Sequence, residues 1–391
     1  MNWKIFSILF LAIFTSMMGQ GLVVPLLPSF AHELGATGLY IGFIFGAFSL
    51  SRTAFLPYFG RLSDMKGRKP LITAGLFFYF LASIAYLLSQ SVNHLILIRF
   101  LQGIASAMVL PIAQAYAGEI TPPGREGWMM GTLNIALYGG LGGGPILGGM
   151  LKDAFNIRAS FLGMGFVCIC GFILCALLLP PRDQEHIRIR SKEPVHYREL
   201  FKNRYIAGIF LFRFIGTICI GTIWAFAPLF ADSIFGFSSF AIGMVITLSV
   251  LTSAVLMAPM GYLADNINKL VMLGLGGFMT ALAMIIFTVA RESWMLFAAS
   301  IILGIGGGIA VPTGLAITVI VGRLKESMGS IMSIMIMAHS FGMIIGPILA
   351  GIMMDFIDIR IAFAGSAILM VLATFATLFM MRSLHLLEQE G

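Results

Sequence analysis

The sequence predicts an all-α membrane protein whose twelve transmembrane helices form two six-helix bundles of the same orientation. Three observations indicate this fold class: the composition, the number of long apolar segments and an internal repeat. Of the 391 residues, 59% are hydrophobic and only 10% are charged, with a mean hydropathy of +0.98. Soluble domains carry roughly 25% charged residues, so the composition excludes an ordinary soluble domain.

A membrane-spanning helix needs about 20 predominantly apolar residues, and the sequence contains twelve such segments. The first could be a signal peptide, but its apolar run is too long for one and it is needed to complete the repeat. The twelve helices are expected at about 5–27, 38–60, 70–90, 94–118, 128–151, 158–180, 206–231, 238–262, 270–290, 294–322, 329–351 and 360–382.

The second half of the chain repeats motifs of the first half at nearly one offset. Parallel repeats of this kind are typical of two-halved transporters, which bind substrate near the membrane midplane. The polar segment between the halves predicts a linker, so the expected domains are 1–180 and 206–391, with a cytoplasmic linker at 181–205. The repeated pairs are Gly60-x-Leu62-x-Asp64 with Gly261-x-Leu263-x-Asp265, Gly103 and Pro111 with Gly304 and Pro312, and Gly144-Pro145-Ile146-Leu147 with Gly346-Pro347-Ile348-Leu349.

Basic residues in short loops indicate which side faces the cytoplasm. Most lysines and arginines of the predicted loops lie on the side that carries the N-terminus, so both termini are expected in the cytoplasm. This bias accounts for the net charge of +7 without a nucleic-acid partner. No G-x-x-x-x-G-K-[ST] motif is present, so an ion gradient is the expected energy source.

Residues 60–70 form the first dense cluster of charge and predict a tight cytoplasmic turn. Gly60 and Gly67 allow close approach of another segment or unusual backbone conformations, and Pro70 suits the first turn of the following helix. Asp64 is the only carboxylate of the segment and could meet a helix N-terminus, which favours an anion. A basic loop that only maintains topology is the alternative, although it would need neither glycine nor aspartate at fixed spacing.

This segment resembles the loop between helices two and three of the major facilitator superfamily, G-x-L-x-D-x-x-G-R-K, at every fixed position. The resemblance implies that superfamily's fold and a cytoplasmic gate. In the second half Asp265 is a weaker copy, because the glycine and the basic pair are missing. The expected gate residues are Gly60, Asp64, Gly67, Arg68, Lys69 and Asp265.

Arg99-x-x-Gln102-Gly103 resembles the helix-four motif of the same superfamily. An arginine inside a membrane helix costs at least about 2.5 kcal/mol and is therefore a functional candidate. The resemblance implies that Arg99 modulates proton movement or holds its helix to the first helix. The alternative is that its side chain extends to the outer membrane surface.

The segment 140–149 resembles the antiporter motif G-x-x-x-G-P-x-x-G-G of the drug:proton antiporter branch, which mostly exports. Small residues at this spacing allow close helix approach, and proline kinks the helix; a simple glycine-rich packing face is the alternative. The partner helix is expected at 329–351, which carries a related Gly342-x-x-x-Gly346-Pro347. The motif residues are Gly140, Gly144, Pro145, Gly148 and Gly149.

The sequence departs from the tetracycline and quinolone exporters, which it otherwise resembles, at the positions of their membrane acids. Ser16, Ile223 and Gly308 occupy those positions, and no Asp or Glu lies in the middle of a predicted helix. The candidates for proton coupling are therefore Arg99 and His339, whose imidazole titrates near neutral pH. A histidine that only packs between helices is an equal alternative for His339.

Arg52 and Arg213 lie inside predicted helices. They would attract an anionic group of the substrate if they face a cavity, whereas they would act as anchors if they reach the lipid headgroups. Polar and aromatic residues of other helices complete the expected cavity. Its candidates are Gln20, Arg52, Gln102, Asn134, Tyr138, Arg213 and Trp224.

The leading hypothesis is a monomeric, proton-coupled exporter of amphipathic organic compounds in the bacterial inner membrane, similar to multidrug efflux proteins. No metal or other cofactor and no catalytic residue is expected. The second hypothesis is a transporter of an anionic metabolite, siderophore or lipid-like solute that uses Arg52 and Arg213. An integral-membrane enzyme is disfavoured because H-E-x-x-H and paired membrane carboxylates are missing, and a channel because no selectivity filter is visible.

Overall fold

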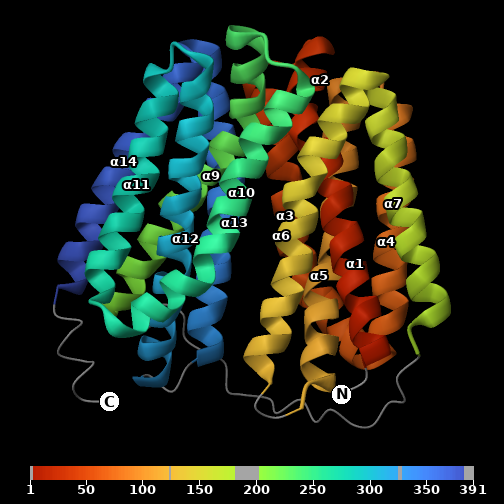
Figure 1. Cartoon of the computed structure of the whole chain (residues 1–391), viewed down its shortest axis with the longest axis horizontal. Helices are drawn as coiled ribbons and strands as arrows, with labels where there is room; N and C mark the ends of the chain where they lie inside the picture. The colour runs from red at the N-terminus through yellow and green to blue at the C-terminus, as the bar shows by residue number, and fades with distance from the viewer. Residues whose placement is uncertain (1–2, 123–124, 181–201, 325–327, 383–391) are drawn as a thin grey trace. The chain divides into compact units, whose positions relative to one another are not determined.

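The computed structural model describes residues 3–122, 125–180, 202–324 and 328–382. These residues form helices and no strand, as expected from their apolar segments (Figure 1). Most of the expected linker at 181–205 lies outside the described residues. The long helices are α1 (Trp3–Val23), α3 (Gly38–Lys66), α4 (Arg68–Leu87), α5 (Val92–Ile120), α6 (Glu126–Ala154), α7 (Ile157–Leu178), α9 (Arg204–Phe235), α10 (Ser239–Asn266), α11 (Lys269–Val289), α12 (Ser293–Leu324), α13 (Met328–Phe356) and α14 (Ile359–Met381).

The first predicted helix is divided by two prolines. After α1 ends at Val23, a 3₁₀ turn (Val24–Leu26) and the short α2 (Leu27–Glu33) continue in helical conformation. Pro25 and Pro28 stand in the first positions of these two elements, where a missing N–H donor costs no helical hydrogen bond.

Eleven stretches of the described residues are long and apolar enough to cross a membrane, and α6, with 29 residues, is the twelfth long helix. The predicted twelve-helix fold is therefore confirmed. Large apolar side chains are exposed on the outer faces of these helices, such as Phe166 (70%), Leu177 (76%) and Val255 (73%). Side chains of this kind suit a helix surface in contact with lipid.

The described residues form two compact units. The first unit comprises those within 1–189 together with 228–247, and the second unit comprises those within 190–227 and 248–391. In the first unit α1 packs against α6 and α7, and α5 packs against α3 and α4. In the second unit α11 packs against α12 and α14 (Figure 1). Residues 228–247 are the end of α9 and the start of α10, which therefore pack within the first unit.

The sequence repeat recurs in the helix packing of each unit. A methyl group at Gly103 would lie 2.1 Å from Ser51 Oγ on α3, and one at Gly304 would lie 2.6 Å from Thr252 Cβ on α10. The two contacting pairs are related by the same 201-residue offset as the sequence motifs. Two helices of like orientation therefore cross at matching glycines in both units, as a parallel repeat requires.

Candidate functional site

The connection between α3 and α4 consists of Gly67 alone. Its φ of 89° is a conformation that favours glycine. Gly60 and Asp64 lie inside α3 and not in a turn, and Gly60 has no positive φ, so the prediction of an unusual backbone was correct only for Gly67. Helix α3 continues past its apolar segment because Arg61, Asp64 and Lys66 can be helical and hydrated at the same time.

Arg68 joins three helices at this turn. Its Nη2 lies 2.5 Å from Asp64 Oδ1 at the end of α3 and 2.8 Å from Glu119 Oε1 at the end of α5, while Nη1 donates to the hydroxyl of Ser63. Arg68 itself is only 9% exposed. A single guanidinium fork therefore holds two carboxylates and a hydroxyl, a geometry that lysine cannot reproduce.

Glu119 was not among the predicted gate residues, although its position near the end of its helix places it on the side of this turn. Lys69 follows Arg68 in the first turn of α4 and is half-buried. The corresponding residue of the second half, Asp265, belongs to α10, but its side chain lies outside the described residues.

Arg99 is buried in the first unit with an exposed fraction of 3%. Its Nε donates to Ile44 O on α3 at 3.4 Å, its Nη1 donates to Gln102 Oε1 at 3.0 Å, and its guanidinium lies 4.2 Å from the ring centroid of Phe48. The Tyr86 hydroxyl on α4 donates to the same Gln102 oxygen at 3.0 Å. Arg99 therefore connects α5 to α3 instead of the first helix, and it does not extend to the surface.

Arg213 and His339 were predicted separately, and the structure brings them together in the second unit. Arg213 Nη2 on α9 lies 3.4 Å from His339 Nδ1 on α13, and the Thr217 hydroxyl lies 3.4 Å from the same nitrogen. A guanidinium only donates hydrogen bonds, so Arg213 can bond to Nδ1 only in the tautomer that leaves this nitrogen unprotonated. In the other tautomer Nδ1–H would donate to the Thr217 hydroxyl, whose own proton goes to Arg213 O at 2.7 Å. Protonation of His339 would place a second positive charge beside Arg213.

The glycine motif of α6 packs against α1. A methyl group at each of three glycines would overlap the α1 backbone, so the two helices are at the closest approach that glycine permits. The expected partner, 329–351, was wrong. These methyl groups would lie 2.7 Å from Phe14 O for Gly140, 2.5 Å from Gly21 Cα for Gly144 and 2.0 Å from Leu22 O for Gly148.

The related motif of α13 has its own partner within the second unit. Methyl groups at Gly342 and Gly346 would both lie 2.6 Å from backbone oxygens of α9, those of Phe214 and Ile218. Each antiporter-like motif therefore holds the fifth helix of its unit to the first helix of the same unit. The two motifs are therefore equivalent by the repeat.

The end of α6 is bound to the start of α10 inside the first unit. Asp153 accepts hydrogen bonds from the backbone N–H groups of Ser239 (2.9 Å) and Phe240 (2.8 Å), which are the first residues of α10. One turn earlier, a methyl group at Gly149 would lie 2.2 Å from Ser239 O. Partial burial raises the pKa of the Asp153 carboxyl, but the hydrogen bonds outweigh it and hold that pKa below its ordinary value.

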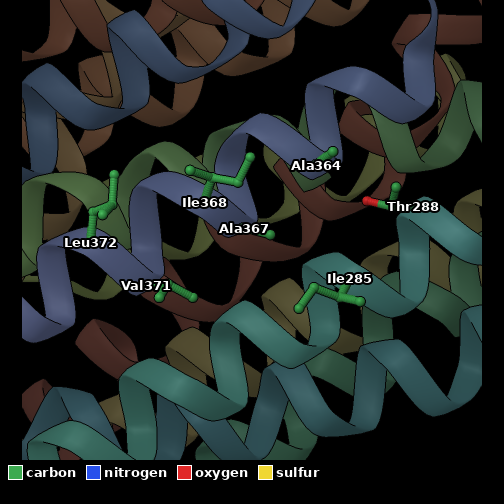
Figure 2. Close-up of a pocket in the computed structure, with 7 residues that line it drawn as sticks. All are labelled: Ile285, Thr288, Ala364, Ala367, Ile368, Val371 and Leu372. Carbon is green, nitrogen blue, oxygen red and sulfur yellow. The ribbon is translucent and has the colours of Figure 1, made fainter.

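The remaining cavity candidates lie on three helices. Gln20 on α1 is buried, Asn134 on α6 is exposed, and Tyr138 on α6 and Trp224 on α9 are half-buried. A cavity of about 290 Å³ lies between α11 and α14 (Figure 2). None of the predicted cavity residues lines it, and its only polar side chain belongs to Thr288, so it offers no charged group to a substrate. Its lining is Ile285, Thr288, Ala364, Ala367, Ile368, Val371 and Leu372.

Comparison with known proteins gives one family and several relatives. The family model of the Major Facilitator Superfamily matches residues 9–238 and 209–389. An uncharacterised transporter of this superfamily from Methanocaldococcus jannaschii is 30% identical over 367 residues, which cover 92% of this chain and 94% of the relative. The multidrug resistance protein MdtG of Salmonella heidelberg is 25% identical over 380 residues, which cover 94% and 93%.

Solved structures share the fold at low sequence identity. The nucleoside transporter NupG superimposes with a TM-score of 0.82 at 14% identity, covering 96% of this chain and 99% of the other. A bacterial homologue of the human lysosomal transporter Spinster also gives a TM-score of 0.82, at 12% identity, covering 97% and 96%.

Proposed function

The chain belongs to the major facilitator superfamily, and on this premise we propose that it is a proton-coupled exporter of amphipathic organic compounds that works by alternating access. It is a multi-pass membrane transporter of small molecules. The observation that carries the proposal is the packing of the α6 motif. Gly140, Gly144 and Gly148 contact the backbone of α1 directly, without side chains between the two helices. The names of MdtG and of a multidrug resistance protein of Bacillus subtilis, 26% identical over 250 residues (64% of each chain), favour the same substrate class.

One buried cluster and one half-buried pair are the proposed route of proton coupling, because no carboxylate lies at mid-helix among the described residues. The first is Arg99 with Gln102 and Tyr86. The second is His339 with Arg213, in which we propose a neutral imidazole that accepts a hydrogen bond from the guanidinium. Proton uptake by His339 replaces that attraction with repulsion between two cations. The contact between α9 and α13 then weakens, which is how a proton would alter the helix packing of this unit.

The turn at Gly67 is the proposed cytoplasmic gate, with Arg68 held by Asp64 and Glu119. We propose that the halves 1–180 and 206–391 are the moving domains, joined by the linker 181–205, and that both termini are cytoplasmic. The protein would act as a monomer in the bacterial inner membrane, with protons and an amphipathic solute as its ligands. The substrate would contact Gln20, Arg52, Asn134, Tyr138, Arg213 and Trp224.

The test measures efflux of cationic dyes from proteoliposomes that contain the purified protein, under an imposed proton gradient. We expect saturable efflux that stops when an uncoupler removes the gradient. Asp64→Asn should reduce this efflux strongly without loss of folded protein, while Asp355→Asn serves as a variant of equal charge change outside the proposed gate. Uncoupler-insensitive efflux, or normal efflux by Asp64→Asn, would contradict the proposal.

A second candidate function is transport of an organic anion, and it is favoured by the deep arginines. Arg213 contacts His339, which adds no negative charge, so the pair supplies positive charge to its surroundings. The same proteoliposomes distinguish the two candidates. Uptake of organic anions that is lost in Arg213→Gln, together with no movement of cationic dyes, would favour this second function.

A further inference from the structure

The centre of the first unit contains buried polar groups that make no hydrogen bond. Arg52 and Ser106 are the middle residues of α3 and α5, and Tyr79 lies near the middle of α4. Tyr79 is 0% exposed and Ser106 is 1% exposed, and neither hydroxyl makes a hydrogen bond. One turn before Ser106, the amide nitrogen of Gln102 is also buried and unbonded.

Close packing of α3, α4 and α5 places these side chains at a similar depth along the helix axes. A methyl group at Gly103 would lie 2.1 Å from Ser51 Oγ, which places α5 directly against the residue that precedes Arg52. A methyl group at Gly75, one turn before Tyr79, would lie 3.0 Å from Ala105 O, beside Ser106. The Tyr79 hydroxyl is close enough to interact electrostatically with Arg52 and faces Ser106 without an acceptable hydrogen-bond geometry.

Within the described residues no carboxylate forms an ion pair with Arg52. Residues 38–120 are described without a gap, and their only carboxylates, Asp64 and Glu119, are both bound to Arg68. Within the described residues Arg52 forms neither an ion pair nor a hydrogen bond. A guanidinium in the middle of a membrane helix is costly unless an anion or several acceptors compensate it, and neither the Tyr79 nor the Ser106 hydroxyl accepts a hydrogen bond from Arg52.

We propose that Arg52, Tyr79, Ser106 and Gln102 bind a small monovalent anion, of the size of a halide ion or a carboxylate group, inside the first unit. Arginine supplies the charge, two hydroxyls and an amide supply neutral donors, and an anion accepts from all of them. The site lies within one unit and requires no particular transported solute. Arg52 is also a proposed substrate contact and Gln102 belongs to the proposed proton-coupling cluster, but anion binding is measured without transport and so tests the site by itself.

The test is an anion titration of the purified full-length protein, with the thermal unfolding midpoint followed by intrinsic tryptophan fluorescence. Sodium chloride, sodium bromide and sodium benzoate are each exchanged against sodium gluconate at constant ionic strength. A ligand that binds only the folded state raises the midpoint in a saturable manner. We expect this response in the wild-type protein, its loss in Arg52→Gln and a several-fold higher half-saturating concentration in Tyr79→Phe.

Arg360→Gln is the matched control, because it removes an arginine that donates to Thr288 O and Ala290 O in the second unit. It should lower the midpoint but keep the anion response. A response to halides identifies a free ion as the occupant, whereas a response to benzoate alone identifies the carboxylate of a solute; both support the site. An absent response in the wild-type protein, or an unchanged one in Arg52→Gln, overturns the proposal.

A crystallographic measurement on the wild-type protein covers the case in which Arg52→Gln does not fold. Crystals soaked in sodium bromide should show an anomalous peak among Arg52, Tyr79 and Ser106. Bromide peaks elsewhere and none at this position would overturn the proposal without reference to any variant.

Discussion

Replacing Gly148 by alanine tests the close packing of α6 on α1. The new Cβ would lie 2.0 Å from Leu22 O and 2.7 Å from Leu22 C, and both are backbone atoms that cannot rotate away. The helices must therefore separate along this seam. Overpacking of this kind costs typically about 1–3 kcal/mol, which outweighs the gain of roughly 0.5–1 kcal/mol that alanine brings over glycine in a helix.

Gly143→Ala is the matched control on the same helix. Its Cβ would meet the terminal methyl of Met18 at 3.5 Å and the sulfur of Met18 at 4.0 Å, both ordinary contacts. The helix-propensity gain of about 0.5–1 kcal/mol should then remain, so the two substitutions are expected to change stability in opposite directions. Thermal unfolding midpoints of the two variants in the same detergent measure this difference, and proton-driven dye efflux shows whether the seam matters for transport.

A midpoint for Gly148→Ala that equals or exceeds the wild-type value would refute the reasoning. So would equal losses in both variants, because the effect would then come from any added methyl group on α6 and not from its approach to α1.

Three further predictions concern charged groups. Glu119→Gln should weaken the hold on Arg68 and slow transport less than Asp64→Asn does, because one ionised partner remains; a rate equal to wild type would remove Glu119 from the gate. The pKa of Asp153 is lowered in the folded protein, so its stabilising contribution is complete above the ordinary carboxyl pKa of about 4 and is lost as the pH falls through the lowered value. The unfolding midpoint should thus fall less between pH 6 and pH 3 in Asp153→Asn than in wild type, and parallel curves would contradict this. His339→Ala should flatten the pH dependence of transport, whereas an unchanged profile would exclude His339 as the proton site.

Helix positions were predictable because each span is a long apolar segment that ends at charged or turn residues. Most observed boundaries lie within a few residues of the expected ones, and α3 differs most because it continues to Lys66 through charged residues. The Gly67 turn was also recognisable, since glycine followed by Arg68, Lys69 and Pro70 is a strong signal for the end of one helix and the start of the next.

Contacts between helices were not predictable in the same way. Spans with apolar side chains around the whole circumference carry no amphipathic stripe that would reveal the buried face. The partners also lie far apart along the chain: Arg68 binds Glu119, and Arg213 contacts His339. The shared motif of α6 and α13 reflects internal duplication, and within the first unit the α6 glycines pack against α1.

The single-residue connection at Gly67 has a mechanical consequence. Only one residue links α3 and α4, and Arg68 forms an ion pair with Glu119 on α5. A change in the tilt of one of these three helices therefore moves the other two. Inserting a few flexible residues at Gly67 would let α3 and α4 move independently while leaving every membrane-embedded side chain unchanged. The effect of the short linker on transport could then be measured separately from the effect of the Arg68 ion pairs.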